Sequence, residues 1–266
     1  METKLSLSVI LPLKSAVVKD FDEYFDKCIK SLKIQKTPFN ELVIVHTMEE
    51  QLIKKLESYD FESLNVKMVP FEGKPNYQSQ INLGIENVSS DWVSFFEFDD
   101  EYSSIWFRNV KKYIKSFPNV QGFLPVVVDV DDKGLFVGYT NEATFAASFN
   151  VEIGILTNEL LNEYQNFQSS GMVFKKSLIS DFGGLKSNMK LTFVYEFLLR
   201  LTYNSVRIMT IPKIGYKHIN LREDSIFWNY KNGNEVMSEN EVRFWIDTAK
   251  KEFFFKNKRD INYVES

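Results

Sequence analysis

The first hundred residues of the chain alternate short apolar segments with longer amphipathic ones. The apolar segments have the length and composition of buried strands, and they fall at residues 5–13, 41–46, 66–69 and 91–96. Between the first two, apolar residues from Phe21 to Leu32 recur at helical spacing, and residues 49–58 and 75–88 also have helical patterns. Repeated strand–helix units predict an α/β fold with a mainly parallel sheet sandwiched by helices.

The second half of the chain is less regular, and we expect a mixed arrangement there. Residues 122–130 and 135–139 flank Asp131-Asp132-Lys133-Gly134, a strong hairpin signal. The acidic run of Asp129, Asp131 and Asp132 is assigned to the chemistry of this turn. Further helices are expected at residues 103–116, 158–166, 191–202 and 239–255, with strands at 169–174 and 206–211. No Pro/Gly/Ser-rich linker divides the chain, so residues 1–266 are expected to form one domain.

Composition excludes several classes of protein. Lys and Arg total 32 against 36 Asp and Glu, so the chain lacks the basic surface that is typical of a nucleic-acid-binding protein. One cysteine, Cys28, and two histidines, His46 and His218, are too few for a disulfide framework or a Cys/His zinc site. We expect no partner among the nucleic acids.

The sequence shows no segment that predicts insertion into a membrane. No apolar run approaches the ~20 residues of a spanning helix, and the N-terminus lacks a signal-peptide pattern. We therefore expect a cytoplasmic protein. The aromatic residues Phe253–Phe255 at the end of the last helix, together with nearby lysines, would permit peripheral contact with a membrane.

The acidic run Glu97-Phe98-Asp99-Asp100-Glu101 directly follows the apolar segment at residues 91–96. In open parallel sheets, ligands bind beyond the carboxyl ends of the strands, which is where this run is expected to lie. Carboxylates packed this closely repel one another and lose solvation, and a hard divalent cation such as Mg²⁺ or Mn²⁺ relieves both costs. The alternative is an acidic strand end exposed to solvent, but the position of the run favours a metal site.

Five segments in order resemble motifs of the family 2 glycosyltransferases. These segments are Val9-Ile10-Leu11-Pro12, Asn82-Leu83-Gly84-Ile85, Phe95-Phe96-Glu97-Phe98-Asp99-Asp100, Gly171-Met172-Val173-Phe174 and Tyr195-Glu196-Phe197-Leu198-Leu199-Arg200-Leu201. The third is similar to the segment that contains the DxD motif of the family. The resemblance extends from Leu7 to about Ser225.

The resemblance implies a GT-A fold, which is Rossmann-like, and a nucleoside-diphosphate-sugar donor. It also implies a divalent metal (Mn²⁺ or Mg²⁺), a glycan or other acceptor with a hydroxyl group, and usually inversion at the anomeric carbon. On this reading the single domain has a nucleotide-sugar-binding half at residues 1–102, an acceptor-side half at 103–225 and a C-terminal helical extension at 226–266.

The resemblance also implies which residues bind the metal and the donor. Asp99 matches the main metal ligand, with Glu97 beside it, Asp100 in support and His218 as a third contributor. His46 or Thr47 stands where the family has an aspartate that contacts the nucleotide base. The arginine that the family has before the Asn-Leu-Gly segment is Ile81 here, and Lys74 is expected to replace its charge near the phosphate. The full set of residues expected to contact the nucleotide sugar is Pro12, His46, Thr47, Lys74, Asn82, Glu97, Phe98, Gly171 and Arg222. For Arg222, a plain surface loop is an equally good explanation.

The catalytic base is where the resemblance fails. Phe193 and Val194 occupy the positions at which the family has a Glu-Asp pair that includes the base. Glu196 is the nearest acid, and we expect it to be the base because a lone acid in an apolar helix is costly without a purpose. The alternative for Glu196 is a structural ion pair with Arg200 at i,i+4. Asp181 is the second candidate for the base.

Two other functions compete with that of a glycosyltransferase. A sugar nucleotidyltransferase would also begin with an α/β unit and metal-binding acids. It needs a glycine-rich basic loop after the first strand, however, and residues 13–17 contain no glycine. A non-catalytic GT-A-like module that binds a glycan or a protein partner is favoured by the missing Glu-Asp pair.

Overall fold

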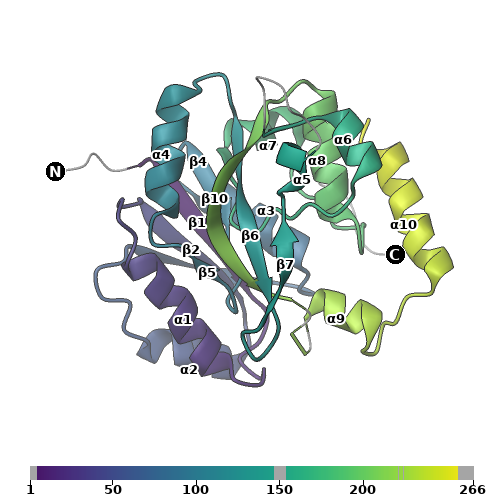
Figure 1. Cartoon of the computed structure of the whole chain (residues 1–266). Coiled ribbons are helices and arrows are strands. Elements are labelled where there is room, and N and C mark those ends of the chain that lie inside the picture. The colour runs from purple at the N-terminus through teal and green to yellow at the C-terminus, as the bar shows by residue number, and fades with distance from the viewer. Residues whose placement is uncertain (1–4, 147–153, 221, 224, 257–266) are drawn as a thin grey trace.

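The computed structural model describes residues 5–146, 154–220, 222–223 and 225–256 (Figure 1). Its first half is β1 (Leu7–Leu13), α1 (Phe21–Lys33), β2 (Glu41–Thr47), α2 (Glu50–Ser58), β3 (Val66–Phe71), α3 (Tyr77–Asn87) and β4 (Trp92–Phe95). Its second half is β5 (Glu101–Tyr102), α4 (Trp106–Ser116), β6 (Gly122–Val130), β7 (Phe136–Thr140), α5 (Ala143–Ala146), β8 (Ile155–Leu156), α6 (Asn158–Glu163), β9 (Val173–Lys175), α7 (Ser177–Phe182), α8 (Phe193–Tyr203), β10 (Ile208–Ile219), α9 (Ile226–Lys231) and α10 (Glu239–Glu252).

Within the described residues, one sheet of ten strands runs through both halves of the chain. Its main path has the order β3-β2-β1-β4-β9-β6-β10-β5, with β7 on β6 and β8 on β10. The strands β3, β2, β1 and β4 pair in parallel, whereas β9 is antiparallel to both of its neighbours. The predicted parallel sheet and the predicted mixed second half are both confirmed.

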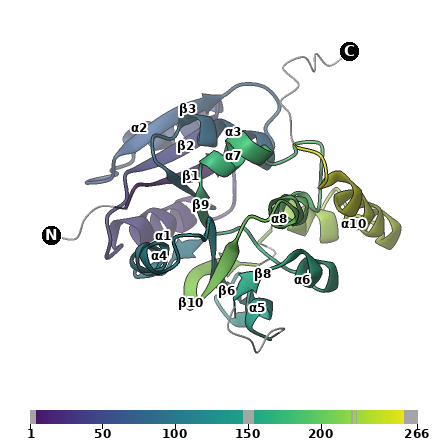
Figure 2. The same cartoon turned by 90° about the horizontal axis from the view of Figure 1, so that it is seen from above.

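Helices cover both faces of this sheet (Figures 1 and 2). Alternate residues of β2 point to opposite faces: Leu42 and Ile44 join one hydrophobic cluster, and Val43 and Val45 join the other. The first cluster includes side chains of α1, α2 and α4, and the second includes side chains of α3, α6, α7, α8 and α10. Burial on both faces explains why these strands have continuous apolar sequences.

Strand β10 is longer than the sequence predicts. We expected a strand at residues 206–211 that ends at Pro212, but β10 continues to Ile219. Its register against β6 shifts between Ile211 and Ile214 and again between Ile214 and Tyr216, so a bulge accommodates the proline. The continuation places His218 inside the sheet, where it pairs with Asp129 of β6.

The end of the chain differs in part from the expected membrane-contacting surface. Phe253 is buried in the cluster that contains α8 and α10, whereas Phe254 and Phe255 are exposed. Residues 257–266 lie outside the described residues. Among the helices that the structure describes, none is long and apolar enough to cross a bilayer.

Candidate active site

A cavity with a volume of about 650 Å³ lies at the carboxyl ends of the central strands. Pro12 of β1, the segment Glu97–Asp99 after β4, Asp129 of β6 and His218 of β10 all line it. The opposite wall comes from the start of α8 and the segment at residues 165–170. The cavity therefore lies where the sheet topology predicts a ligand site.

Glu97, Asp100 and His218 form a compact cluster at this cavity. One potential ligand atom from each side chain lies within 4.8 Å of the other two. His218 Nδ1 is 3.1 Å from both Asp100 carboxylate oxygens, and Asp100 Oδ1 also accepts a hydrogen bond from the backbone N–H of Ile219 at 3.0 Å. Glu97 Oε1 accepts a hydrogen bond from the Ser170 hydroxyl at 2.8 Å.

The ionisation of this cluster is strongly perturbed. Burial, with the charge of Asp100 as the second cause, raises the pKa of Glu97 to about 7. Burial also raises the pKa of Asp100, although the charge and hydrogen bond of His218 oppose it. Burial disfavours the charged form of His218, but the Asp100 and Glu97 carboxylates outweigh it and raise the pKa of His218 to about 10.

These three side chains have the donor chemistry of a divalent-metal site. They offer carboxylate oxygens and one imidazole nitrogen, which suit Mn²⁺ or Mg²⁺. A cation would relieve the repulsion between the acids that raises the pKa of Glu97. The residues present therefore fit a metal.

Asp99 is held by a different partner. Its Oδ2 accepts a 2.6 Å hydrogen bond from Arg222 Nε, and the Arg222 guanidinium lies 4.8 Å from the centre of the Phe98 ring. Both charged side chains are almost buried. The expectation that Asp99 is the main metal ligand stays a prediction, because the acids that converge with His218 are Glu97 and Asp100.

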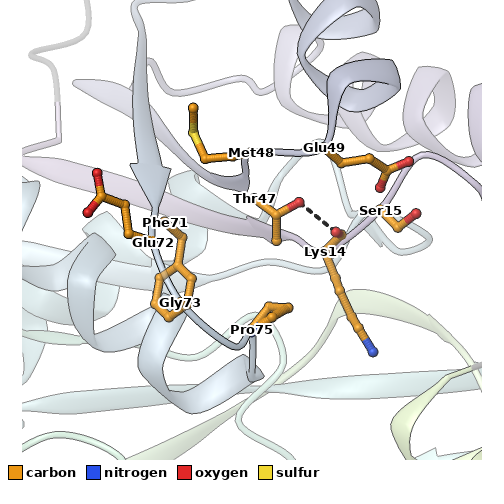
Figure 3. A pocket seen from close by; sticks show the side chains of 9 residues that line it. All are labelled: Lys14, Ser15, Thr47, Met48, Glu49, Phe71, Glu72, Gly73 and Pro75. Carbon is orange, nitrogen blue, oxygen red and sulfur yellow. Dashed lines mark hydrogen bonds between the residues drawn. The ribbon is translucent and has the colours of Figure 1, made fainter. Parts of the chain in front are cut away.

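A second cavity of about 460 Å³ adjoins the first, since Lys14 and Ser15 line both. Figure 3 shows the side chains around it, which come from the ends of β1, β2 and β3 and the loops that follow them. The Thr47 hydroxyl donates a 2.7 Å hydrogen bond to the carbonyl of Lys14 and so connects the first two of these loops (Figure 3).

His46, expected near the nucleotide base, and Lys74, expected near the phosphate, behave differently from Thr47. His46 is buried and lines neither cavity; its Nδ1 lies 3.0 Å from the carbonyl oxygen of Thr47. Lys74 is exposed on the loop between Gly73 and Pro75, which both line the smaller cavity. The structure thus brings Thr47 to the cavity but not His46, because alternate residues of β2 face opposite sides of the sheet.

Three other predicted site residues have structural positions instead. Asn82 donates to the carbonyl of Leu185 at 2.7 Å and accepts from its N–H at 2.9 Å, so it connects α3 to the loop after α7. Gly171 has a φ of 72°, and an added Cβ would lie 2.5 Å from the Tyr216 ring. Asp181 is exposed on α7. None of the three lines either cavity, so a contact with the donor or acceptor stays a prediction for each.

Glu196 is not at the cavity either. It is fully buried in α8 and forms a two-bond ion pair with Arg200, at 2.9 and 3.0 Å, and a further ion pair with Lys186 at 3.2 Å. The residues of α8 that line the cavity are Phe193, Val194 and Tyr195. Because one helical residue corresponds to about 100° of rotation, Glu196 faces away from Val194. These contacts are those of the structural alternative for Glu196, and a role as the base stays a prediction.

The sequence interpretation missed one acid that does line the cavity. Asp131 has the predicted turn chemistry, since its Oδ1 accepts from the N–H groups of Lys133 and Leu135. Asp129, in contrast, lies in β6, is only 6% exposed and lines the large cavity. A lone acid within the otherwise apolar strand at residues 122–130 was the signal for it.

This fold and site define a GT-A glycosyltransferase, with an acidic cluster at the end of β4 and a two-part cavity beyond the parallel strands. The chain belongs to glycosyl transferase family 2, whose model matches residues 8–181, more than half of the chain. The family expected from the five segments is confirmed.

One relative is the teichoic acid poly(glycerol phosphate) polymerase of Staphylococcus epidermidis. It is 26% identical over 105 residues, which are 39% of this chain but only 14% of that protein.

Solved structures share the fold at low identity. TarS 1–349 of S. aureus in complex with UDP-GlcNAc matches with a TM-score of 0.67 at 18% identity, over 96% of this chain and 68% of that one. The mannosyltransferase PcManGT of Pyrobaculum calidifontis in complex with GDP-Man and Mn²⁺ matches with a TM-score of 0.61 at 13% identity, over 94% and 65% of the two chains.

Proposed function

We propose that this glycosyltransferase is metal-dependent and inverting, and that it moves a sugar from a nucleoside diphosphate to a hydroxyl group of a glycan or other acceptor. The observation that supports this most is the convergence of Glu97, Asp100 and His218 at the larger of two adjoining cavities. The smaller cavity has room for a nucleoside, and the larger for a sugar and an acceptor.

The position of each group suggests its role with the donor. Thr47 lies in the smaller cavity, where we place the base and ribose. The diphosphate would lie beside Lys14 and Ser15, which line both cavities. Arg222, which lines the larger cavity, would be a second cationic group near it. A divalent cation bound by Glu97, Asp100 and His218, with Asp99 beside them, would neutralise charge on the departing diphosphate.

The chain itself prepares this site for transfer. Ser170 orients Glu97, and the Ile219 N–H orients Asp100, so two of the ligands are held before any donor binds. Phe193, Val194 and Phe227 give the large cavity an apolar wall that excludes water from the sugar. Attack by an acceptor on the side opposite the diphosphate inverts the anomeric carbon.

Thermal shift with a panel of nucleoside diphosphates and nucleotide sugars, with and without Mn²⁺, tests this proposal. UDP, UDP-GlcNAc, GDP and GDP-Man are the first members, since structural neighbours bind UDP-GlcNAc and GDP-Man. We expect one nucleotide to raise the unfolding temperature only with Mn²⁺, by mass action on the folded state. The absence of a shift with any nucleotide would contradict the donor site.

A matched pair of variants makes the test specific for the cluster. Asp100→Asn removes a buried carboxylate from the cluster and should abolish the Mn²⁺-dependent part of the shift. Glu101→Gln alters the next residue, which forms an ion pair with Lys217 on a partly exposed surface, and should keep the shift. If both variants behave alike, the metal is bound elsewhere.

One observation favours the second candidate, a non-catalytic binding module. The start of α8 presents Phe193 and Val194 to the cavity where the family has acids. The two functions differ in turnover: a glycosyltransferase slowly releases nucleoside diphosphate from its donor even with water as acceptor, and a binding module does not.

A further inference from the structure

The large cavity contains one carboxylate that the donor and metal do not account for. Among the described residues that line it, the acids are Glu97, Asp99 and Asp129. Glu97 belongs to the metal cluster, and Asp99 is paired with Arg222. Asp129 is the remaining acid.

Asp129 is directed by two donors. The Thr140 hydroxyl donates to Asp129 Oδ2 at 2.5 Å, and Gln168 Nε2 donates to Asp129 Oδ1 at 3.2 Å. Each carboxylate oxygen of Asp129 keeps a lone pair for another donor. Asp129 is also the register partner of His218 in the parallel pair β6–β10, so its side chain lies on the same face as the metal cluster.

The loop that supplies Gln168 is itself fixed. Asn141 Nδ2 donates to the carbonyls of Pro125 and Gln168, at 3.0 and 3.1 Å, and Asn141 Oδ1 accepts from the Gln168 N–H at 2.9 Å. The hairpin of β6 and β7 and the segment at residues 165–170 therefore form one rigid wall of the cavity. A group built on such a wall keeps its position when substrates enter.

Gln168 has an unused acceptor at this wall. Its Nε2 must face the Asp129 carboxylate, since the opposite orientation of the amide would put two acceptors together. Its Oε1 is then buried without a hydrogen-bond partner among the described residues. A buried acceptor of this kind is costly unless a ligand donates to it. A hydroxyl-rich acceptor, such as a sugar or another polyol, supplies that donor.

We propose that Asp129 is the general base for the acceptor and that Gln168 binds a neighbouring hydroxyl of the same molecule. This assignment rests on the proposed function. An Asp129 oxygen takes the proton of the attacking hydroxyl, whose oxygen forms the bond to the anomeric carbon. The bond from that carbon to the diphosphate oxygen breaks, and its electron pair leaves with the nucleoside diphosphate. Asp129 afterwards gives the proton to solvent, so the products are the glycoside, the nucleoside diphosphate and one proton.

The experiment measures release of nucleoside diphosphate with Mn²⁺ and the donor selected by the thermal-shift panel, with water and then with glycerol as the acceptor. Asp129→Asn keeps the size of the side chain but removes its basicity. We expect a fall in kcat of about 100-fold or more, which is the usual contribution of a general base. The Kd of the nucleoside diphosphate should stay within about twofold, since Asp129 does not contact the donor in this proposal.

Two further variants separate this role from a structural one. Asp132→Asn changes an exposed acid in the same hairpin and should keep the wild-type kcat. Gln168→Leu should raise the KM for glycerol without changing the Kd of the nucleoside diphosphate, because the acceptor loses a partner and the nucleotide does not.

The outcomes distinguish this assignment from the proposed function. Turnover by the wild type that Asp129→Asn leaves unchanged contradicts the assignment alone. No turnover by the wild type with any donor contradicts the proposed function and the assignment together. If Asp129→Asn does not fold, Gln168→Leu decides, and an unchanged KM for glycerol overturns the acceptor site.

Discussion

The guanidinium of Arg200 is fully buried, and each of its nitrogen atoms donates hydrogen bonds. It donates to the carbonyls of Phe182, Gly183 and Gly184 and forms two hydrogen bonds with Glu196. Lys186 approaches the same Glu196 carboxylate at 3.2 Å. A buried charge network of this kind is costly to break, because removal of one member leaves the others uncompensated.

Glu196→Gln should therefore act on stability and not on the chemical step. We expect a loss of about 3 kcal/mol in the free energy of unfolding, measured by urea denaturation, because Arg200 loses its anion and Lys186 loses one of its two. Glu50→Gln is the matched control: it breaks an exposed i,i+4 pair with Lys54 and should cost less than about 0.5 kcal/mol. A folded Glu196→Gln with wild-type stability and no turnover would restore Glu196 as the base.

At the scale of elements, the start of β2 is tied to its neighbours through Glu41. One oxygen of this carboxylate accepts hydrogen bonds from the Ser8 hydroxyl and from the N–H and hydroxyl of Ser89, each at 2.7 Å. Burial acts to raise the pKa of Glu41, but these hydrogen bonds outweigh it and lower the pKa below its ordinary value of 4.5. The ionised form thus stabilises the junction of β1, β2 and the loop before β4.

The lowered pKa predicts acid sensitivity. The stabilisation by Glu41 is fully present above pH 4.5 and is lost as the pH falls through the lower pKa of the folded state. Between pH 7 and pH 3, the free energy of unfolding should therefore fall further in the wild type than in Glu41→Gln. At pH 7 the variant should be less stable by about 1–3 kcal/mol. Equal pH slopes in denaturant titrations would contradict this.

The packing of α3 on the sheet depends on Gly84. A Cβ at this position would lie 2.4 Å from Ile10 Cγ2 and 3.2 Å from Val45 Cγ2. Helix α3 can therefore approach β1 and β2 closely only with glycine here. Close packing thus accounts for a glycine inside this helix, although glycine lowers helix stability by about 1 kcal/mol relative to alanine.

Gly84→Ala should destabilise the protein despite its better helix propensity. We expect a loss of about 1–3 kcal/mol from overpacking, measured by thermal or urea unfolding. The control is Gly138→Ala in β7, where an added Cβ meets no atom within 4 Å. Ile10→Ala in the same chain should relieve the clash, so the double variant should be more stable than the sum of the single changes predicts. Additive effects would locate the cost elsewhere.

At the scale of the molecule, the C-terminal helix belongs to the main hydrophobic core. Ala249 of α10 is fully buried with residues of α8, and the carbonyl of Trp245 accepts a 2.8 Å hydrogen bond from the Thr192 hydroxyl. Lys186 donates to the carbonyl of Glu252 at 2.6 Å. Since Ile246 also lines the large cavity, α10 supports the wall that begins α8.

Ala249→Asp tests this role of α10. A buried and unpaired carboxylate should lower the free energy of unfolding by more than about 2 kcal/mol in a single cooperative transition. Arg243→Asp, at an exposed position of the same helix, should change it by less than about 0.5 kcal/mol. Loss of α10 in a separate early transition would show that the helix is an independent extension.

Much of the architecture follows from local patterns that a sequence displays directly. The alternation of apolar segments with the amphipathic stripe from Phe21 to Leu32 predicts strands and helices, and their order predicts the parallel sheet. The acidic run after residues 91–96 lies at the end of β4 as predicted, because strand direction determines where the run emerges. Strand continuity past Pro212 was missed, since a bulge depends on the neighbouring strand β6.

The sequence by itself determined the family, the layers and the acid-rich strand end, because each depends on residues close together in the chain. Only the tertiary structure decided which acids share a cavity. The register of β10 on β6 places Asp129 beside His218, and the rotation of α8 turns Glu196 into the core toward Arg200 and Lys186. Both outcomes depend on how distant segments pack. A shift of one residue in a strand, or of two residues in a helix, turns a side chain to the opposite face, so local sequence alone does not fix which face an acid occupies.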